Sequence, residues 1–126
     1  MIRGKNGAIG FALAAISLLG FAALVPAQVR LPAVIGDHMV VQQDKPVTIW
    51  GWAGKSEPVT VLFSGLEKKA VAGADGTWRV VFDPLKAGGA PLEMTVRGAK
   101  GPEIVVKDVL IGEVWFCSGQ SNMEMA

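Results

Sequence analysis

Two serines near the C-terminal end of this 126-residue chain are the side chains best placed to do chemistry. Ser118 and Ser121 follow an apolar run, residues 110–117, and flank a glycine. Glu124 stands three residues after Ser121, which is the capping-box spacing of a helix start. A serine at a strand–turn–helix junction is exposed, and the free backbone N–H groups of the helix start can hold a developing oxyanion. The spacing alone leaves open whether such a serine is a nucleophile or an ordinary helix cap.

A nucleophilic serine needs a base within hydrogen-bond reach, and the chain has few candidates. Its single histidine, His38, lies far upstream, where we expect a structural or surface role. Its single cysteine, Cys117, ends the apolar run, and we expect a small buried apolar group there rather than a second nucleophile. One Cys and one His do not build a closed zinc site, and Asp37, Asp75 and Asp108 show no metal-ligand spacing. We therefore expect no metal and no cofactor.

The charge balance of the chain argues against one class of partner, nucleic acid. Twelve Lys and Arg residues stand against eleven Asp and Glu residues, for a formal net charge of +1. Binding to a nucleic-acid backbone needs a basic surface, so the sequence predicts no nucleic-acid partner. A content of 51% hydrophobic and 18% charged residues indicates a folded chain rather than a disordered one.

The N-terminal segment has the pattern of an export signal. Arg3 and Lys5 precede residues 8–25, which contain no charge, and Ala27 follows as a small residue before a cleavage point. This order predicts a signal peptide at residues 1–27, with contact to the membrane only during export to the periplasm or the extracellular space. An uncleaved anchor is the alternative, although the apolar run is short for a membrane span. Cleavage would remove two basic residues and change the net charge from +1 to −1.

Residues 28–108 read as short strands separated by Gly and Pro turns. Apolar residues recur at every second position rather than with a helical period, which predicts an all-β antiparallel β-sandwich of jelly-roll or immunoglobulin-like type. Asp75-Gly76 predicts a hairpin turn, and Gly51 suggests a bulge within its strand. Trp78 and Phe82 share one strand face and are expected in the core. For Trp50 and Trp52 the pattern leaves core and surface patch both open. The expected strands cover residues 47–52, 59–64, 67–72, 78–83, 92–97 and 103–109.

A family resemblance adds to this interpretation. Residues 109–124, VLIGEVWFCSGQSNME, closely resemble the nucleophile block of the sialate O-acetylesterase family, which are SGNH-type (GDSL-like) carbohydrate esterases. Residues 35–43 (IGDHMVVQQ) and 46–53 (PVTIWGWA) resemble the opening segment of that family, and residues 75–78 and 85–89 match later landmarks. The resemblance implies a β-sandwich that leads into a flavodoxin-like α/β/α hydrolase domain.

The same resemblance assigns roles near the C-terminal end. It implies that Ser121 is the nucleophile, that its own N–H is one oxyanion donor, and that Gly119, Gln120 and Asn122 support the nucleophile turn. It implies no metal, and a substrate that is an O-acetylated sugar such as a sialic acid. The Asp and His of the family's later blocks have no counterpart in the 126 residues.

These expectations divide the chain into a signal peptide (1–27), a β-sandwich (28–108) and the first strand and helix start of a truncated SGNH hydrolase domain (109–126). Without an Asp/His base the chain is expected to be inactive alone. Two alternatives stay open. One is a secreted sandwich that binds carbohydrate or protein through its tryptophans without catalysis, and the other is a structural domain that supports a hydrolase. The oligomeric state is not fixed by the sequence.

Overall fold

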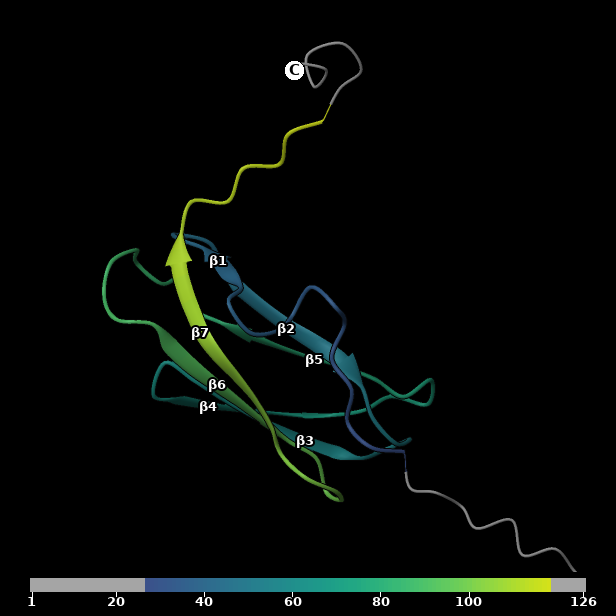
Figure 1. Ribbon diagram of the computed structural model, residues 1–126. Coiled ribbons are helices and arrows are strands. Elements are labelled where there is room, and N and C mark those ends of the chain that lie inside the picture. Colours follow the sequence, from purple (N-terminus) through teal and green to yellow (C-terminus); the bar gives the residue numbers. More distant parts are fainter. Residues whose placement is uncertain (1–26, 119–126) are drawn as a thin grey trace, which may run out of the picture.

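The computed structural model describes residues 27–118, and within this range the protein is all-β with no helix. The expectation of an all-β fold is therefore confirmed, and no helix in this part of the chain could cross a membrane. Figure 1 shows the strands along one curled body. Their bounds are β1 Val40–Gln42, β2 Val47–Trp52, β3 Pro58–Phe63, β4 Leu66–Val71, β5 Thr77–Phe82, β6 Leu92–Arg97 and β7 Ile104–Gly112.

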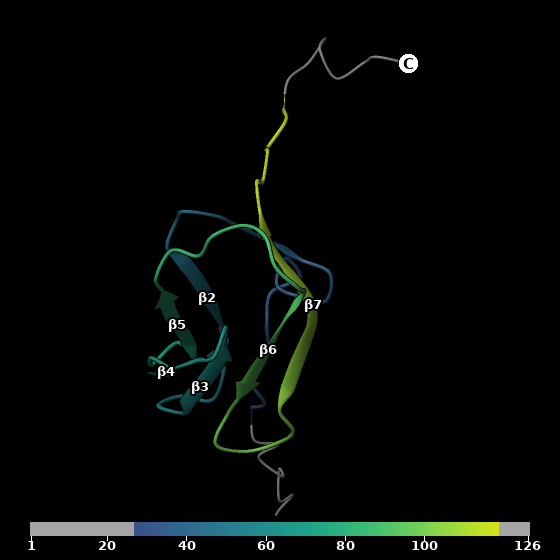
Figure 2. The same ribbon diagram turned by 90° about the vertical axis from the view of Figure 1, so that its left-hand side faces the viewer.

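The strands form a five-stranded sheet in the order β1-β7-β6-β3-β4 and a two-stranded sheet of β2 and β5. Figure 2 shows β2 and β5 on one side of the body and β6 and β7 on the other. All neighbouring strands are antiparallel except β1 and β7, which run parallel from Val40 opposite Leu110 to Gln42 opposite Gly112. The expectation of a purely antiparallel arrangement is wrong at this pair, because strand alternation reports a buried face and not a pairing direction.

One hydrophobic core lies between the two sheets. Along β3 and β5 every second residue is buried, which is the period-two pattern of a strand with one face on a core. Phe63 of β3 and Phe82 of β5 meet across the core in a T-shaped contact, with ring centroids 5.7 Å apart. Trp78 and Phe82 are both buried, as the sequence predicts. Trp50 lies on the opposite, outer face of β2 and is 38% exposed.

The two-residue turn that makes a hairpin is Ser64-Gly65 and not Asp75-Gly76. Ser64 and Gly65 both have positive φ, 51° and 73°, which suits the tight connection between β3 and β4. Gly76 also has positive φ, but the strand that follows it, β5, pairs with β2 in the other sheet. The hairpin predicted at Asp75-Gly76 is therefore wrong. The turn itself is local and is present, whereas the pairing partner of β5 is set by packing of distant segments.

Gly51 is required by a close approach of backbone and not by a bulge. The β2–β5 register runs without a break from Val47 opposite Phe82 to Trp52 opposite Thr77, so the predicted bulge is wrong. The backbone of Arg30 instead pairs with Trp52, through N–H···O bonds of 2.8 and 2.9 Å. A Cβ on Gly51 would overlap the carbonyl oxygen of Arg30 and lie 3.1 Å from the ring of Trp78.

Gly51→Ala should lower the free energy of unfolding by about 1–3 kcal/mol, because the added methyl must displace backbone rather than a flexible side chain. Urea denaturation followed by Trp fluorescence measures this change. Gly36→Ala is the matched control, since nothing lies within 4 Å of its added Cβ. Equal stability of the two variants would contradict the close approach at Gly51.

A bulge does occur, in β7 at Asp108. Met94 of β6 pairs with Val106 and Leu92 pairs with Val109, so three steps along β7 match two along β6. Asp108 has φ 57°, and the extra residue allows both Val106 and Val109 to face the core. Residues 109–112, which the sequence assigned to the start of a second domain, form the end of β7 in this sheet.

Candidate active-site segment

The segment that leads to the expected nucleophile leaves the sheet at the end of β7. Residues 113–118 run away from the body of strands in Figure 1 and are all exposed. Ser118, the weaker of the two serine candidates, is among them. Ser121, Gly119, Gln120 and Asn122 lie outside the described residues, so their roles stay predictions. The structure therefore shows how the segment that precedes the expected nucleophile is anchored.

Glu113 is the first anchor of this segment. Its carboxylate accepts a hydrogen bond from Nε2 of Gln42, at 3.1 Å, and a short one from Nε2 of Gln43. The Oε1 atom of Gln42 in turn accepts a hydrogen bond from the backbone N–H of Val114, at 2.8 Å. The last residue of β1, Gln42, and the next residue, Gln43, thus hold the first two residues after β7. This arrangement fixes the direction in which the chain leaves the sheet.

Gln43 extends the same network to the loop after β5. Its backbone N–H donates to the carbonyl of Gly112 at 2.8 Å, continuing the parallel β1–β7 pairing by one residue. Its Oε1 atom accepts from the N–H of Ala87 at 3.1 Å. Asp44, the next residue, donates its N–H to the carbonyl of Leu85. The end of β7 is thus tied to residues from two other parts of the chain.

The Gln42–Gln43–Glu113 network was not predicted from the sequence. Its members are about seventy residues apart, so no local spacing connects them. The only signal available was that polar Gln42 and Gln43 follow a pair of valines, which is ordinary for the end of a strand. The two glutamine hydrogen bonds, that from Gln43 first, lower the pKa of Glu113 below its usual range. The Glu113 carboxylate therefore stays charged at neutral pH and loses this interaction only as the pH falls through the lowered pKa.

Cys117 is exposed, so the expectation of a buried thiol is wrong. The cause is that β7 ends at Gly112, five residues earlier, and the apolar residues after it do not continue the sheet. Trp115 and Phe116, which share this run, are 82% and 92% exposed. Of the apolar run at residues 110–117, only residues 110–112 pair with neighbouring strands, and the rest is exposed.

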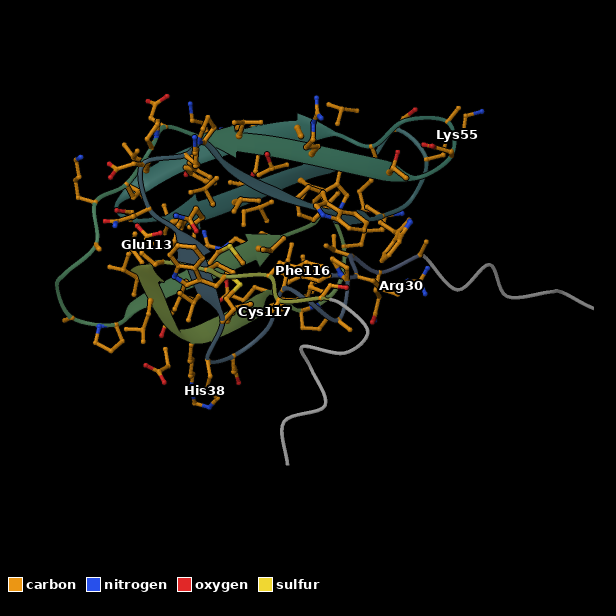
Figure 3. The ribbon with its side chains drawn as sticks, turned by 90° about the horizontal axis from the view of Figure 1, so that it is seen from above. Arg30, His38, Lys55, Glu113, Phe116 and Cys117 are labelled. Carbon is orange, nitrogen blue, oxygen red and sulfur yellow. The ribbon has the colours of Figure 1, made fainter. Side chains whose placement is uncertain are left out.

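His38 forms a pair with Asp108 on the bulge of β7. The His38 Nδ1 atom lies 2.6 Å from Oδ2 of Asp108, and Figure 3 shows His38 at the margin of the molecule, pointing outward. Reciprocal contacts hold the loop in place: the N–H of His38 donates to the carbonyl of Lys107, and the N–H of Lys107 donates to Asp37. His38 has φ 65°, so both members of the pair have left-handed backbone.

This pair lies apart from the serine segment. Within residues 27–118 His38 is bound to Asp108, and no hydrogen bond or ion pair joins it to Ser118. His38 acts within this structure as part of the contact that fastens residues 36–39 to β7.

The contact with Asp108 raises the pKa of His38 above its ordinary value of 6.5, mainly through the side-chain hydrogen bond and then through charge attraction. A raised folded-state pKa means that protonated His38 stabilises the fold below about pH 6.5 and that this stabilisation disappears as the pH rises through the raised value. We expect the stability difference between the native chain and His38→Gln to be full below about pH 6.5 and to shrink as the pH rises through the raised pKa of His38.

Because the chain has one histidine, a single imidazole resonance reports its titration by NMR. Asp108→Asn should return the pKa of His38 toward 6.5, since Asn tolerates the same backbone but carries no charge. Asp75→Asn should leave the titration unchanged, because that carboxylate is bound instead by Thr77. A His38 pKa that is the same in all three proteins would show that the Asp108 pair does not form in solution.

Within residues 27–118 no group of three or more His, Cys, Asp or Glu side chains could hold a metal ion. His38 pairs with Asp108 alone, and Asp37 accepts a hydrogen bond from the backbone N–H of Lys107.

Comparisons with known proteins agree with the resemblance of the sequence motifs. No protein-family model matches the chain. The sialate O-acetylesterase of Rattus norvegicus is 42% identical over 106 residues, and that of Homo sapiens is 41% identical. Each match covers 76% of this chain and 19% or 20% of the relative. The chain thus spans about a fifth of the length of these relatives.

A solved structure resembles the fold as well. The crystal structure of a novel carbohydrate acetylesterase from Xanthomonas citri superimposes with a TM-score of 0.71 and 40% sequence identity. That match covers 76% of this chain and 22% of the solved chain. Sequence and fold lead to the same group of proteins, and the chain is related to the sialate O-acetylesterase family through the three quarters of its length that it shares with them.

Proposed function

We propose that this chain is part of an esterase that removes O-acetyl groups from sialic acids or related sugars, with Ser121 as its nucleophile. The observation that carries the proposal is the 42% identity to sialate O-acetylesterase over 76% of the chain. The Gln42–Gln43–Glu113 network supports it, because it anchors the approach to Ser121 on the sheet. A nucleophile must be held in a fixed position to gain from proximity to its substrate.

In the proposed reaction Ser121 Oγ attacks the acetyl carbonyl carbon while a base takes its proton. The tetrahedral intermediate expels the sugar oxygen, which leaves as a hydroxyl, and an acetyl-enzyme remains. Water then attacks the acetyl-enzyme and releases acetate. The N–H of Ser121 is one donor to the oxyanion, and Gly119, Gln120 and Asn122 shape the turn that presents it. No step requires a metal or a cofactor.

The base must come from outside the chain's own 126 residues. Their only histidine is His38, and its imidazole is already bound to Asp108. We therefore expect the 126-residue chain alone to release no acetate, and an Asp/His pair of a larger enzyme to complete the site.

We further propose that the two sheets around one core are a β-sandwich that supports the hydrolase, and that residues 1–27 are a signal peptide for export. The shared core of the two sheets supports the first proposal. The charge-free run at residues 8–25 supports the second.

A chimera tests the proposed function directly. Residues 28–126 replace the matched segment of the rat sialate O-acetylesterase, so that the rest of that enzyme supplies the missing residues. Acetate release from an O-acetylated sialic acid is measured for the chimera and for the 126-residue chain alone. The proposal expects activity from the chimera only. A folded chimera that shows no activity would contradict it, as would equal activity from the isolated chain.

A further inference from the structure

An open cavity lies on the outer side of the two-stranded sheet, away from the serine segment. Its volume of about 470 Å³ falls in the range of small-molecule sites, roughly 300–1,000 Å³. The residues that line it are Trp50, Val71, Gly73, Thr77, Trp78 and Arg79. Neither the esterase chemistry nor the anchoring of the serine segment uses these residues.

Trp50 provides an aromatic wall whose position is fixed by neighbours. It packs against Trp52 in a T-shaped contact, with centroids 5.3 Å apart and planes at 73°. Arg30 lies over the ring of Trp52, its guanidinium carbon 5.7 Å from the centroid. This stack of three side chains restricts the motion of Trp50 while leaving it 38% exposed. A partly exposed indole that is already held in place can pack a ligand ring with little loss of conformational freedom.

Arg79 places a positive charge beside this wall. It lies directly opposite Trp50 in the β2–β5 register, on the same outer face, where such cross-strand partners are about 5 Å apart. Arg79 is exposed, and within residues 27–118 it takes part in no ion pair or side-chain hydrogen bond. Asp75, the acidic residue of the adjacent turn, is bound by the N–H and hydroxyl of Thr77. A guanidinium with its donors unused is suited to bind a carboxylate through two parallel hydrogen bonds.

Trp78 also lines the cavity, although its side chain faces the core rather than the outer face of the sheet. Its side chain is 97% buried, and its Nε1–H has no hydrogen-bond partner among the described residues. A buried donor without a partner costs about 1–3 kcal/mol. This Nε1 atom has almost no solvent-accessible surface, so it lies within the core and takes no part in the proposed binding.

We propose that this cavity binds a pyranoside that carries a carboxylate, as an ancillary glycan site whose lining residues take no part in the proposed esterase chemistry. The apolar face of the sugar ring packs on Trp50, and the carboxylate pairs with Arg79. The combination of an aromatic wall and an adjacent free cation favours an acidic sugar over a neutral one. Binding here holds an acidic glycan on the β-domain without any chemical step.

The test compares two glycans that differ only by a carboxylate-bearing sugar, 3′-sialyllactose and lactose, by NMR titration of the 126-residue chain. We expect 3′-sialyllactose to bind at least about tenfold more tightly, because lactose offers Arg79 no carboxylate. Trp50→Ala should abolish binding of 3′-sialyllactose. Arg79→Gln should remove the preference over lactose. Equal affinity for both glycans, or binding of neither, would overturn the proposal.

Arg97→Gln is the matched control for charge. Arg97 is an exposed arginine of β6 whose guanidinium is paired with Glu103, so its loss should leave glycan binding unchanged. A loss of affinity in Arg97→Gln equal to that in Arg79→Gln would attribute binding to net charge and also overturn the proposal. Circular dichroism of each variant separates lost binding from lost folding. The titration needs no acetate release, so failure of the esterase proposal leaves this result unaffected.

Discussion

Ser121→Ala should lower the kcat/KM of the rat chimera for O-acetylated sialic acid by at least about a thousandfold, equivalent to about 4 kcal/mol of transition-state stabilisation. The physical reason is that alanine has no oxygen to form the acetyl-enzyme, so only binding and oxyanion donors remain. Initial rates of acetate release over a range of substrate concentrations give kcat and KM separately. The loss should lie in kcat, since the hydroxyl contributes to the chemical step more than to substrate binding.

Ser118→Ala is the matched control for this prediction. Ser118 is exposed, lies three residues earlier and carries the same hydroxyl, so its loss should change kcat/KM by less than about tenfold. If Ser118→Ala abolished activity while Ser121→Ala retained it, the nucleophile would be Ser118. If both variants stayed active, neither serine would be the nucleophile. The nucleophile can also be identified independently. The reaction is quenched, and mass spectrometry locates the residue that carries the acetyl group.

Phe63→Ala should lower the free energy of unfolding by about 3–5 kcal/mol, the largest stability effect that the core predicts. Phe63 is 1% exposed and meets Phe82 across the two sheets, so its removal leaves a cavity where both sheets are joined. A domain of this size has a total stability of about 5–15 kcal/mol, so this loss is a large fraction of the total. Urea denaturation at 25 °C measures the change in midpoint.

Leu62→Ala controls for this substitution at the neighbouring position. Leu62 is 40% exposed and points to the opposite face of β3, so its truncation should cost about 1 kcal/mol or less. Similar losses in the two variants would mean that the core does not lie between the sheets as described. A change in the slope of the denaturation curve would indicate altered compactness rather than altered packing.

Local patterns predicted most of the strands correctly. Alternation along β2, β3, β5 and β6 identified their buried faces, and the buried Trp78 and Phe82 followed from it. These predictions succeeded because one strand face always meets the core, whatever the partner strand is.

Features that depend on distant partners could not be predicted in the same way. The hairpin at Asp75-Gly76 failed because β5 pairs with β2, and the bulge at Gly51 failed because the Arg30 backbone explains that glycine. The bulge at Asp108 could not be predicted from the sequence. A positive φ usually coincides with glycine, but the residue at this position is aspartate. The expected burial of Cys117 failed because an apolar run does not indicate where pairing ends.

The same difference between local and distant features applies to the candidate site. Ser121 could be proposed from its local motif and a family resemblance, but nothing in sequence spacing indicated what anchors the approach to it. Gln42, Gln43 and Glu113 are ordinary polar residues at strand ends, and their role follows only from the pairing of β1 with β7. A motif therefore identifies a reactive group more readily than the residues that hold it in place.

The parallel pairing of β1 with β7 also has a consequence for the order of folding during synthesis. Val40 pairs with Leu110, seventy residues later, so β1 has no sheet partner until nearly all of the described chain has left the ribosome. Contacts between positions this far apart form slowly, because a long loop must close first. The hairpin of β3 and β4 can form early, whereas the anchor for the serine segment is assembled last. Correct placement of that segment therefore reports that the whole β-domain has folded.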